Sequence, residues 1–396
     1  MANAYRELLA VPGARLFVAA GLVGRMSMAM VGIGVVLLVS AATGSYGVAG
    51  AVSATMSLAY AAGGPVSARF ADRYGQHRVL VPLALANAAG FAALVLCAEL
   101  ALAAWTLFPA AALAGVTQPS LGAWVRARWS HVLRERPARL NTAFSFESVV
   151  DETIFVVGPL LVTALATGVH PAAGLGASAL FTLVGCLALA VQRATEPPPR
   201  PRERARGAAL FGNPGLMVLA PVFLMLGVVF AAIDVTGVAF AEEEGHKGLA
   251  GVLLGCYGLG SGAAALWYGA RAWKSRLDRR FRVGLVLLAV GLVPPVLVDD
   301  LWLMMAVVFF SGLAISPTVI PGYGLVERLV PPHQLTEGLA TVSTLIGVGL
   351  AFGSSIAGRV VDGHGAGTAF LVPLGAALAA AAVGLAGTRR LRTAEQ

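Results

Sequence analysis

The chain has 396 residues, of which 58% are hydrophobic and 12% are charged, and its mean hydropathy is +0.80. This composition excludes a water-soluble globular protein. The formal net charge of +8 would suit a nucleic-acid partner, but the basic residues lie between apolar runs, where membrane proteins concentrate them, so we expect no nucleic acid. The apolar runs are about 20 residues long, which is enough to cross roughly 30 Å of hydrocarbon as helices.

Twelve apolar runs predict an all-α polytopic membrane protein with twelve membrane-spanning helices. All Lys and Arg residues except Arg25, Lys247 and Arg359 fall at the termini or in alternate junctions, which indicates that both termini are cytoplasmic. The predicted spans cover residues 15–41, 46–68, 79–98, 101–124, 141–167, 172–192, 214–240, 248–270, 281–298, 301–325, 338–360 and 368–387. The junctions on the opposite side are acidic or nearly uncharged, including "DGHG" at 362–365.

A polar segment rich in proline and arginine divides the predicted spans into two sets of six. We expect an N-terminal six-helix bundle at 1–192, a cytoplasmic linker at 193–213 and a C-terminal six-helix bundle at 214–396. The composition of the dividing segment is typical of a solvated, extended linker. Two such bundles are the arrangement in which secondary transporters place a substrate site near the middle of the membrane.

The junction after the second span reads "ARFADRYGQHR" at 68–78 and resembles the cytoplasmic loop signature of the major facilitator superfamily. Ala68 replaces the usual first glycine, and Gln76 and His77 stand where basic residues are common. A short turn between antiparallel helices needs a residue that can take a positive φ, which a glycine supplies. The residues that match the signature are Asp72, Arg73, Gly75 and Arg78. The resemblance implies the twelve-helix major facilitator fold and a charged cytoplasmic latch made by these residues.

Three acids, Glu147, Asp151 and Glu152, lie within the fifth predicted span, "NTAFSFESVVDETIFVVGP" at 141–159. Asp151 lies roughly 15 Å past the start of the span and therefore near mid-membrane. Glu147 shares its helix face, being four residues away, and is expected towards the cytoplasmic vestibule, whereas Glu152 is rotated by about 100°. A carboxylate that titrates inside a membrane is what proton coupling requires.

A structural ion pair is the alternative role for these acids, and Arg25 in the first span lies at similar depth. We expect Arg25 to pair with Asp151 or Glu152, in which case removing one partner would strand the other. Asp234 is the one clear acid within a span of the second half, and it could line a cavity or accept a neighbour's hydrogen bond.

Several weaker candidates could line the substrate cavity, although packing is the commoner role for such residues. Gln118 precedes a proline in the fourth span, and Tyr257 lies in the eighth. In the eleventh span Gly349 and Gly353 are four residues apart, which predicts close packing against another helix. The three cysteines fall within apolar spans, and no His, Cys and carboxylate cluster has metal-ligand spacing, so we expect no cofactor and no metal.

Gly158 and Pro159 in the fifth span resemble a fragment of the fifth-helix motif of bacterial drug/proton antiporters. The fourth span departs from those antiporters, because it carries no basic residue before Arg126. The resemblance implies proton coupling at the fifth span.

Together these patterns favour a secondary active transporter that works by alternating access, with proton-coupled efflux of a small amphipathic molecule or metabolite as the expected activity. Proton-coupled uptake is the alternative, and a membrane receptor or enzyme is a remote one. No phosphate-binding glycine loop is present, so we expect no ATP-driven mechanism. No set of nucleophile, base or metal ligands stands out near one membrane face, so we expect no enzymatic activity. The partners are then a small-molecule substrate, protons and the lipid bilayer. We expect a monomer in a bacterial plasma (inner) membrane.

Overall fold

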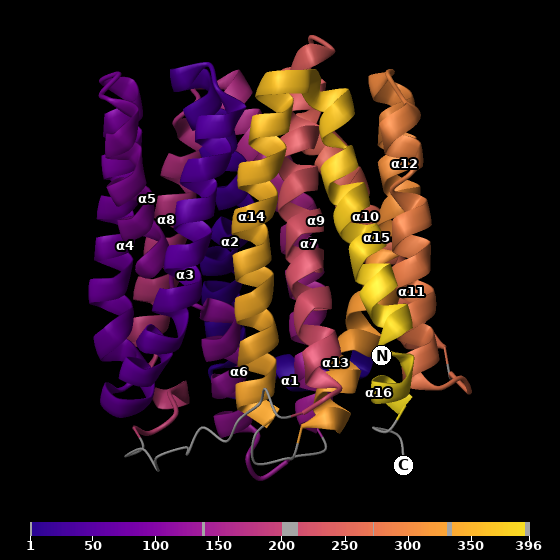
Figure 1. Ribbon diagram of the computed structural model, residues 1–396. Helices are drawn as coiled ribbons and strands as arrows, with labels where there is room; N and C mark the ends of the chain where they lie inside the picture. The colour runs from indigo at the N-terminus through magenta and orange to yellow at the C-terminus, as the bar shows by residue number, and fades with distance from the viewer. Residues whose placement is uncertain (1, 137–138, 200–212, 272, 331–334, 393–396) are drawn as a thin grey trace. The chain divides into compact units, whose positions relative to one another are not determined.

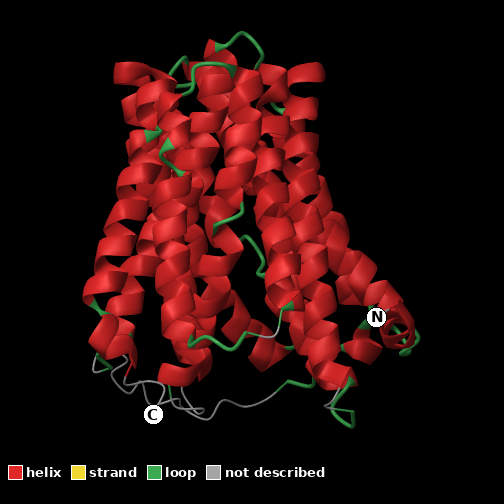
Figure 2. Ribbon diagram, turned by 90° about the vertical axis from the view of Figure 1, so that its right-hand side faces the viewer, coloured by secondary structure: helices red, strands yellow, loops and turns green. Residues whose placement is uncertain are grey.

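The computed structural model describes residues 2–136, 139–199, 213–271, 273–330 and 335–392. Within these ranges the regular structure is helical throughout, with short loops between the helices and no strand (Figure 2). Most of the predicted linker, residues 200–212, lies outside the described residues. The chain forms two compact units, one made of residues 1–38 and 58–205 and the other of residues 39–57 and 206–396.

The first unit contains the helices of the N-terminal half (Figure 1). Among them α4 packs against both α5 and α8, while α7 packs against α6 and α8. The helices are α1 (Ala2–Leu9), α2 (Ala14–Thr43), α3 (Tyr46–Tyr74), α4 (Gln76–Glu99), α5 (Leu107–Val116), α6 (Leu121–Val132), α7 (Leu140–Gly168) and α8 (Ala173–Val191). Residues 39–57, which include the end of α2 and the start of α3, belong to the second unit instead.

The second unit is built around α9, which packs against α14 and α15. Its helices are α9 (Leu216–Glu243), α10 (Ala250–Ala270), α11 (Leu277–Gly291), α12 (Leu301–Gly312), α13 (Ile315–Leu329), α14 (Leu335–Ala369), α15 (Leu371–Ala386) and α16 (Thr388–Arg392). A Cβ atom on Gly349 of α14 would overlap the carbonyl oxygen of Leu224, and one on Gly353 would lie against Val228. The close packing predicted from these two glycines is therefore confirmed.

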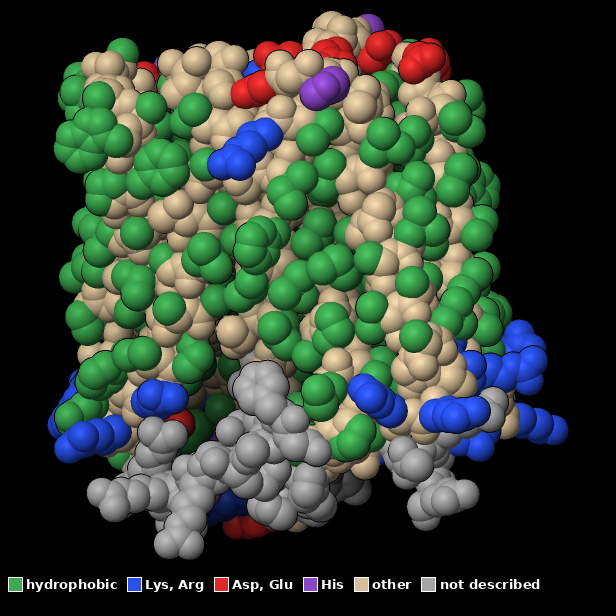
Figure 3. All heavy atoms as spheres, viewed as in Figure 1, with side chains coloured by type: hydrophobic (Ala, Val, Ile, Leu, Met, Phe, Trp, Pro, Cys, Tyr) green, Lys and Arg blue, Asp and Glu red, His purple; other side chains and the backbone are tan. Residues whose placement is uncertain are grey.

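Nine helical stretches in the described part of the chain are long and apolar enough to cross a membrane. The remaining three of the twelve predicted spans correspond to α3, the α5–α6 pair and α15. On the right of Figure 3, over the second unit, hydrophobic side chains cover the middle of the helices, with acidic side chains at the upper end and basic ones at the lower end. This separation suits a lipid-facing band between two polar surfaces.

The fourth span is not one continuous helix, as the sequence suggested, but two. Helix α5 ends at Val116 and α6 begins at Leu121, with Gln118 and Pro119 in the break. The reason is local, because a proline lacks the backbone N–H and disfavours the helical conformation of the residue before it. Helix α6 then continues to Val132, well past the predicted end of the span at 124.

The junction predicted at 362–365 contains a break in helical geometry, although α14 as a whole runs from Leu335 to Ala369. Gly365 has a φ of 81° and a ψ of 167°, so two helical segments meet there at a kink. A glycine tolerates this left-handed conformation without the steric cost that other residues meet.

Candidate functional site

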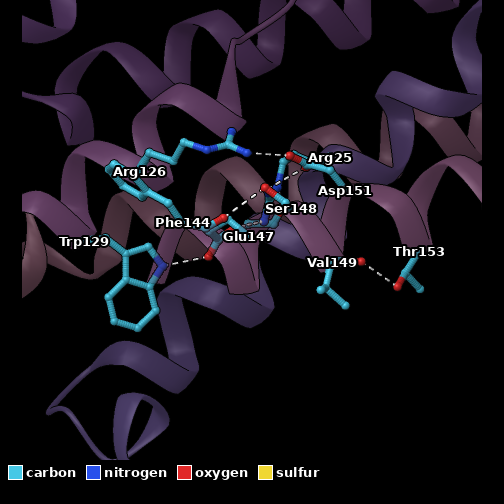
Figure 4. Close-up of polar contacts among 10 residues, drawn as sticks. Arg25, Arg126, Trp129, Phe144, Glu147, Ser148, Val149, Asp151 and Thr153 are labelled. Atoms are coloured by element: carbon cyan, nitrogen blue, oxygen red, sulfur yellow. Dashed lines mark hydrogen bonds and ion pairs between the residues drawn. The ribbon is translucent and has the colours of Figure 1, made fainter. Parts of the chain in front are cut away.

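A cluster of charged side chains lies inside the first unit, where α2, α6 and α7 meet (Figure 4). Arg25 of α2 is at its centre and is only 2% exposed. Its Nη2 atom donates to Glu147 Oε2 at 2.5 Å and its Nη1 atom donates to Asp151 Oδ1 at 2.8 Å. Its Nε atom donates to the carbonyl oxygen of Gly21, one turn earlier, at 3.0 Å. Arg25 is thus held on three sides.

The two carboxylates of the cluster, both on α7, differ in their exposure to solvent. Glu147 is fully buried, and Trp129 of α6 donates to its second oxygen at 2.7 Å. Asp151 keeps 22% of its side chain exposed, and Arg126 of α6 donates to its Oδ2 atom at 2.7 Å. The spacing of four residues places both acids on one helix face, while Arg126 and Trp129, three residues apart, share a face of α6.

The cluster holds two guanidinium groups and two carboxylates, so its formal charges cancel when both acids are ionised. A buried charge is costly unless it is paired and hydrogen-bonded, and each of these four groups meets that condition. Removing one charge would leave its partner uncompensated, at a cost of about 3–5 kcal/mol for a fully buried pair. The cluster can therefore change its protonation state only together with a change in its contacts.

The structure brings together some of the residues singled out in the sequence and leaves others apart. Arg25 pairs with Asp151, as expected, and with Glu147, which was not expected. Within the described residues it forms no ion pair with Glu152, which is half-buried on the adjacent position of α7. The expectation that Glu147 reaches a cytoplasmic vestibule is wrong, because its side chain is sealed from solvent beneath Trp129.

Arg126 and Trp129 are members of the cluster that sequence reasoning missed. Both lie beyond residue 124, where the fourth span was predicted to end, and Arg126 was counted among the loop charges. The break at Pro119 was the available signal, because a helix that restarts at Leu121 carries Arg126 about one and a half turns into α6.

Gln118 lies in a separate polar group within the first unit. Its side-chain oxygen accepts a hydrogen bond from Asn87 Nδ2 at 3.0 Å, and Asn87 also donates to the carbonyl oxygen of Ala114 at 2.8 Å. Asn87 thus satisfies a carbonyl in the last turn of α5 and contacts Gln118 in the helix break. In the second unit, Asp234 of α9 is half-buried and Tyr257 of α10 is buried.

The segment that carries the loop signature contains the tight turn expected of it. Gly75, with a φ of 92°, is the single residue between α3 and α4. Asp72 is exposed, and Arg73 lies over the ring of Tyr74 at 5.1 Å. Gln76, which departs from the signature, accepts a hydrogen bond from the buried Arg128 of α6 at 2.8 Å.

Comparisons with known proteins identify the family. The model of the Major Facilitator Superfamily matches residues 17–283 and 238–395. The nucleoside transporter NupG is 13% identical, with a TM-score of 0.72 over 94% of this chain and 98% of that one. The POT family transporter PepTSo is 12% identical, with a TM-score of 0.75 over 97% and 99% of the two chains.

A bacterial homologue of the iron transporter ferroportin, in an outward-facing state, is 17% identical, with a TM-score of 0.64 over 95% and 99% of the two chains. No match was found among curated proteins. At these identities the solved structures establish the fold and not the substrate. The family match covers nearly the whole chain, and the twelve-helix fold agrees with it, so this chain belongs to the Major Facilitator Superfamily and is a multi-pass membrane transporter.

Proposed function

We propose that the protein is a proton-coupled secondary active transporter of a small organic molecule and that Asp151 is the group that takes up the proton. The observation that carries this proposal is the difference between the two acids of the cluster. Glu147 is sealed and doubly hydrogen-bonded, whereas Asp151 is 22% exposed and pairs on one side with the half-exposed Arg126. Asp151 is therefore the acid that protons and substrate can reach.

Guanidinium groups donate to both oxygens of Asp151, and these contacts suit the ionised form of the carboxylate. A substrate that draws Arg126 away removes one of these contacts and makes protonation of Asp151 easier. By linkage, a protonated Asp151 releases Arg126 and so favours the substrate by the same free energy. Alternating access then carries proton and substrate together.

This coupling favours proton-driven uptake over the efflux that the sequence favoured. In an exchange mechanism a cationic substrate would compete with the proton for Asp151. Arg25 and Arg126 already occupy the two oxygens of that carboxylate, which leaves a cation facing a guanidinium group. We further propose that the charged residues at 72–78 act as a cytoplasmic latch and that the protein is a monomer in a bacterial plasma membrane with both termini cytoplasmic.

Proteoliposomes that enclose a pH-sensitive dye test this function. A pool of organic acids, nucleosides, dipeptides, sugars and amines is added outside, and the internal pH is followed, with protein-free liposomes as the background. The wild type should give a protein-dependent change of internal pH, and Asp151→Asn should abolish it. Thr153→Val is the matched control, because the exposed Thr153 hydroxyl donates within its own helix, to the carbonyl oxygen of Val149 (Figure 4). An undiminished response of Asp151→Asn contradicts the proposal.

A further inference from the structure

The second cation of the cluster, Arg126, has N–H donors that make no hydrogen bond within the described residues. A guanidinium group has five N–H donors. Arg25 uses three of its nitrogen atoms, on Gly21, Glu147 and Asp151, and is buried. Arg126 makes one side-chain hydrogen bond within the described residues, through Nη2 to Asp151, and 35% of its side chain is exposed. Arg25 therefore serves the cluster, whereas Arg126 can also serve a ligand.

A glycine provides the space in which the guanidinium of Arg126 lies. A Cβ atom at Gly122, one turn earlier in α6, would be 3.1 Å from Arg126 Nη1 and 3.6 Å from Arg25 Cδ. The first distance is tight and the second is an ordinary van der Waals contact, so the absence of a side chain at Gly122 leaves room for the guanidinium of Arg126 in its present position. Gly122 is thus a positioning residue for the exposed end of the cluster.

The charge balance selects the ligand. With both acids ionised, the cluster of Arg25, Arg126, Glu147 and Asp151 is neutral, and protonation of Asp151 leaves a net charge of +1 at its exposed end. Among the described residues, Glu152 on the next position of α7 is a further acid near Asp151. Helix α8 carries no charged residue, and Glu7 of α1 pairs with Arg139 instead. An anion is the partner that a freed guanidinium binds best, and carboxylates and phosphates fit its planar fork.

We propose that the substrate is a small organic anion, with a carboxylate or phosphate group that binds Arg126 while Asp151 takes the proton. This inference rests on the proposed function and adds the substrate class to it. The anion replaces Asp151 as the partner of Arg126, so proton and anion bind in the same state and their charges cancel. All four carboxylate oxygens of the cluster already accept a hydrogen bond, so a cation would meet Glu152 and not the cluster. A neutral molecule would leave the freed guanidinium unpaired.

Ligand-induced thermal stabilisation of the purified full-length protein tests this inference, because a ligand that binds the native state raises its stability. Three pools share the same carbon skeletons: carboxylates with phosphate monoesters, the neutral amides and alcohols, and the primary amines. The anion pool should stabilise the protein, with an affinity higher at pH 6 than at pH 8. Stabilisation by the amine or neutral pool alone, or by no pool, overturns the inference.

Two arginine variants connect the result to the site. Arg126→Gln should weaken binding of the selected anion about tenfold or more, the usual loss for a charged hydrogen bond. Arg126→Lys should retain part of the affinity, because the positive charge remains while the fork is lost. Gly122→Ala should weaken anion binding while leaving its dependence on pH, which depends on Asp151, in place. Wild-type affinity in Arg126→Gln overturns the inference.

The outcomes separate this inference from the proposed function. If anions bind through Arg126 with the same affinity at both pH values, and Asp151→Asn changes nothing, the substrate class stands and proton coupling at Asp151 fails. If proton flux depends on Asp151 but only amines or neutral molecules drive it, the proposed function stands and the anion fails. Glu152→Gln serves as a further variant. If anion binding loses its pH dependence in Glu152→Gln and keeps it in Asp151→Asn, Glu152 and not Asp151 takes up the proton.

Discussion

Replacing Arg25 by methionine should destabilise the protein more than any single loss of a surface charge. Arg25→Met removes the cation that pairs with both Glu147 and Asp151 of α7. It leaves Glu147, whose side chain is 0% exposed, with Trp129 as its remaining hydrogen-bond donor in the cluster. Asp151 keeps Arg126 and is partly exposed, so most of the cost arises at Glu147. Stranding one partner of a buried pair costs about 3–5 kcal/mol, against at most about 1 kcal/mol for an exposed pair.

The double variant Arg25→Met, Glu147→Gln isolates this cost. It removes both charges of the fully buried pair, so it should be less destabilised than the sum of the two single variants, with a coupling of about 2 kcal/mol. The free energy of unfolding in mixed detergent micelles, followed by tryptophan fluorescence, measures all four proteins. The reasoning is refuted if Arg25→Met costs less than about 1 kcal/mol. It is equally refuted if the single costs add to within about 0.5 kcal/mol.

Three further changes test the fold within the two units. The Asp362 carboxylate accepts hydrogen bonds from Ser45 Oγ and from two backbone N–H groups in the first turn of α3. Hydrogen exchange in that turn should therefore accelerate in Asp362→Ala, while Asp362→Asn should retain part of the protection. Unchanged exchange in both variants would contradict this role of Asp362. Gly349→Ala should destabilise by about 1–3 kcal/mol through overlap with α9, whereas Gly375→Ala, with nothing within 4 Å, should not; equal melting temperatures would rule this out. Gly75→Ala should lower the free energy of unfolding by about 1–2 kcal/mol, because the φ of 92° at this position is unfavourable for a residue with a side chain. An unchanged free energy of unfolding would argue against this.

The sequence was sufficient for the membrane class and for most of the spans. The length of the apolar runs and the distribution of Arg residues are read directly along the chain. They depend on the lipid bilayer around the protein and not on which helices pack together. The single glycine turn at Gly75 was also predictable, because a one-residue connection between two helices leaves few alternatives. Close packing at Gly349 followed from small residues at helical spacing.

The composition of the charged cluster was only partly predictable. Depth along a helix can be estimated from about 1.5 Å per residue, which is why Arg25 and Asp151 were matched correctly. The depth of a residue in the membrane does not indicate which side chains of other helices contact it, so the burial of Glu147 against Trp129 was missed. Arg126 was missed for another reason, because the break at Pro119 shifts the fourth span and brings an arginine that resembled a loop residue against Asp151.

The number of protons taken up for each anion bound is the measurement that tests the central claim most directly. The anion with the highest affinity in the carboxylate and phosphate panel is titrated into the weakly buffered, purified protein, and the pH change is recorded. The wild type should take up protons as the anion binds, up to about one for each anion, since binding at Arg126 and protonation of Asp151 are linked. Asp151→Asn should take up none. Anion binding without proton uptake by the wild type, or equal uptake by Asp151→Asn, would contradict the account.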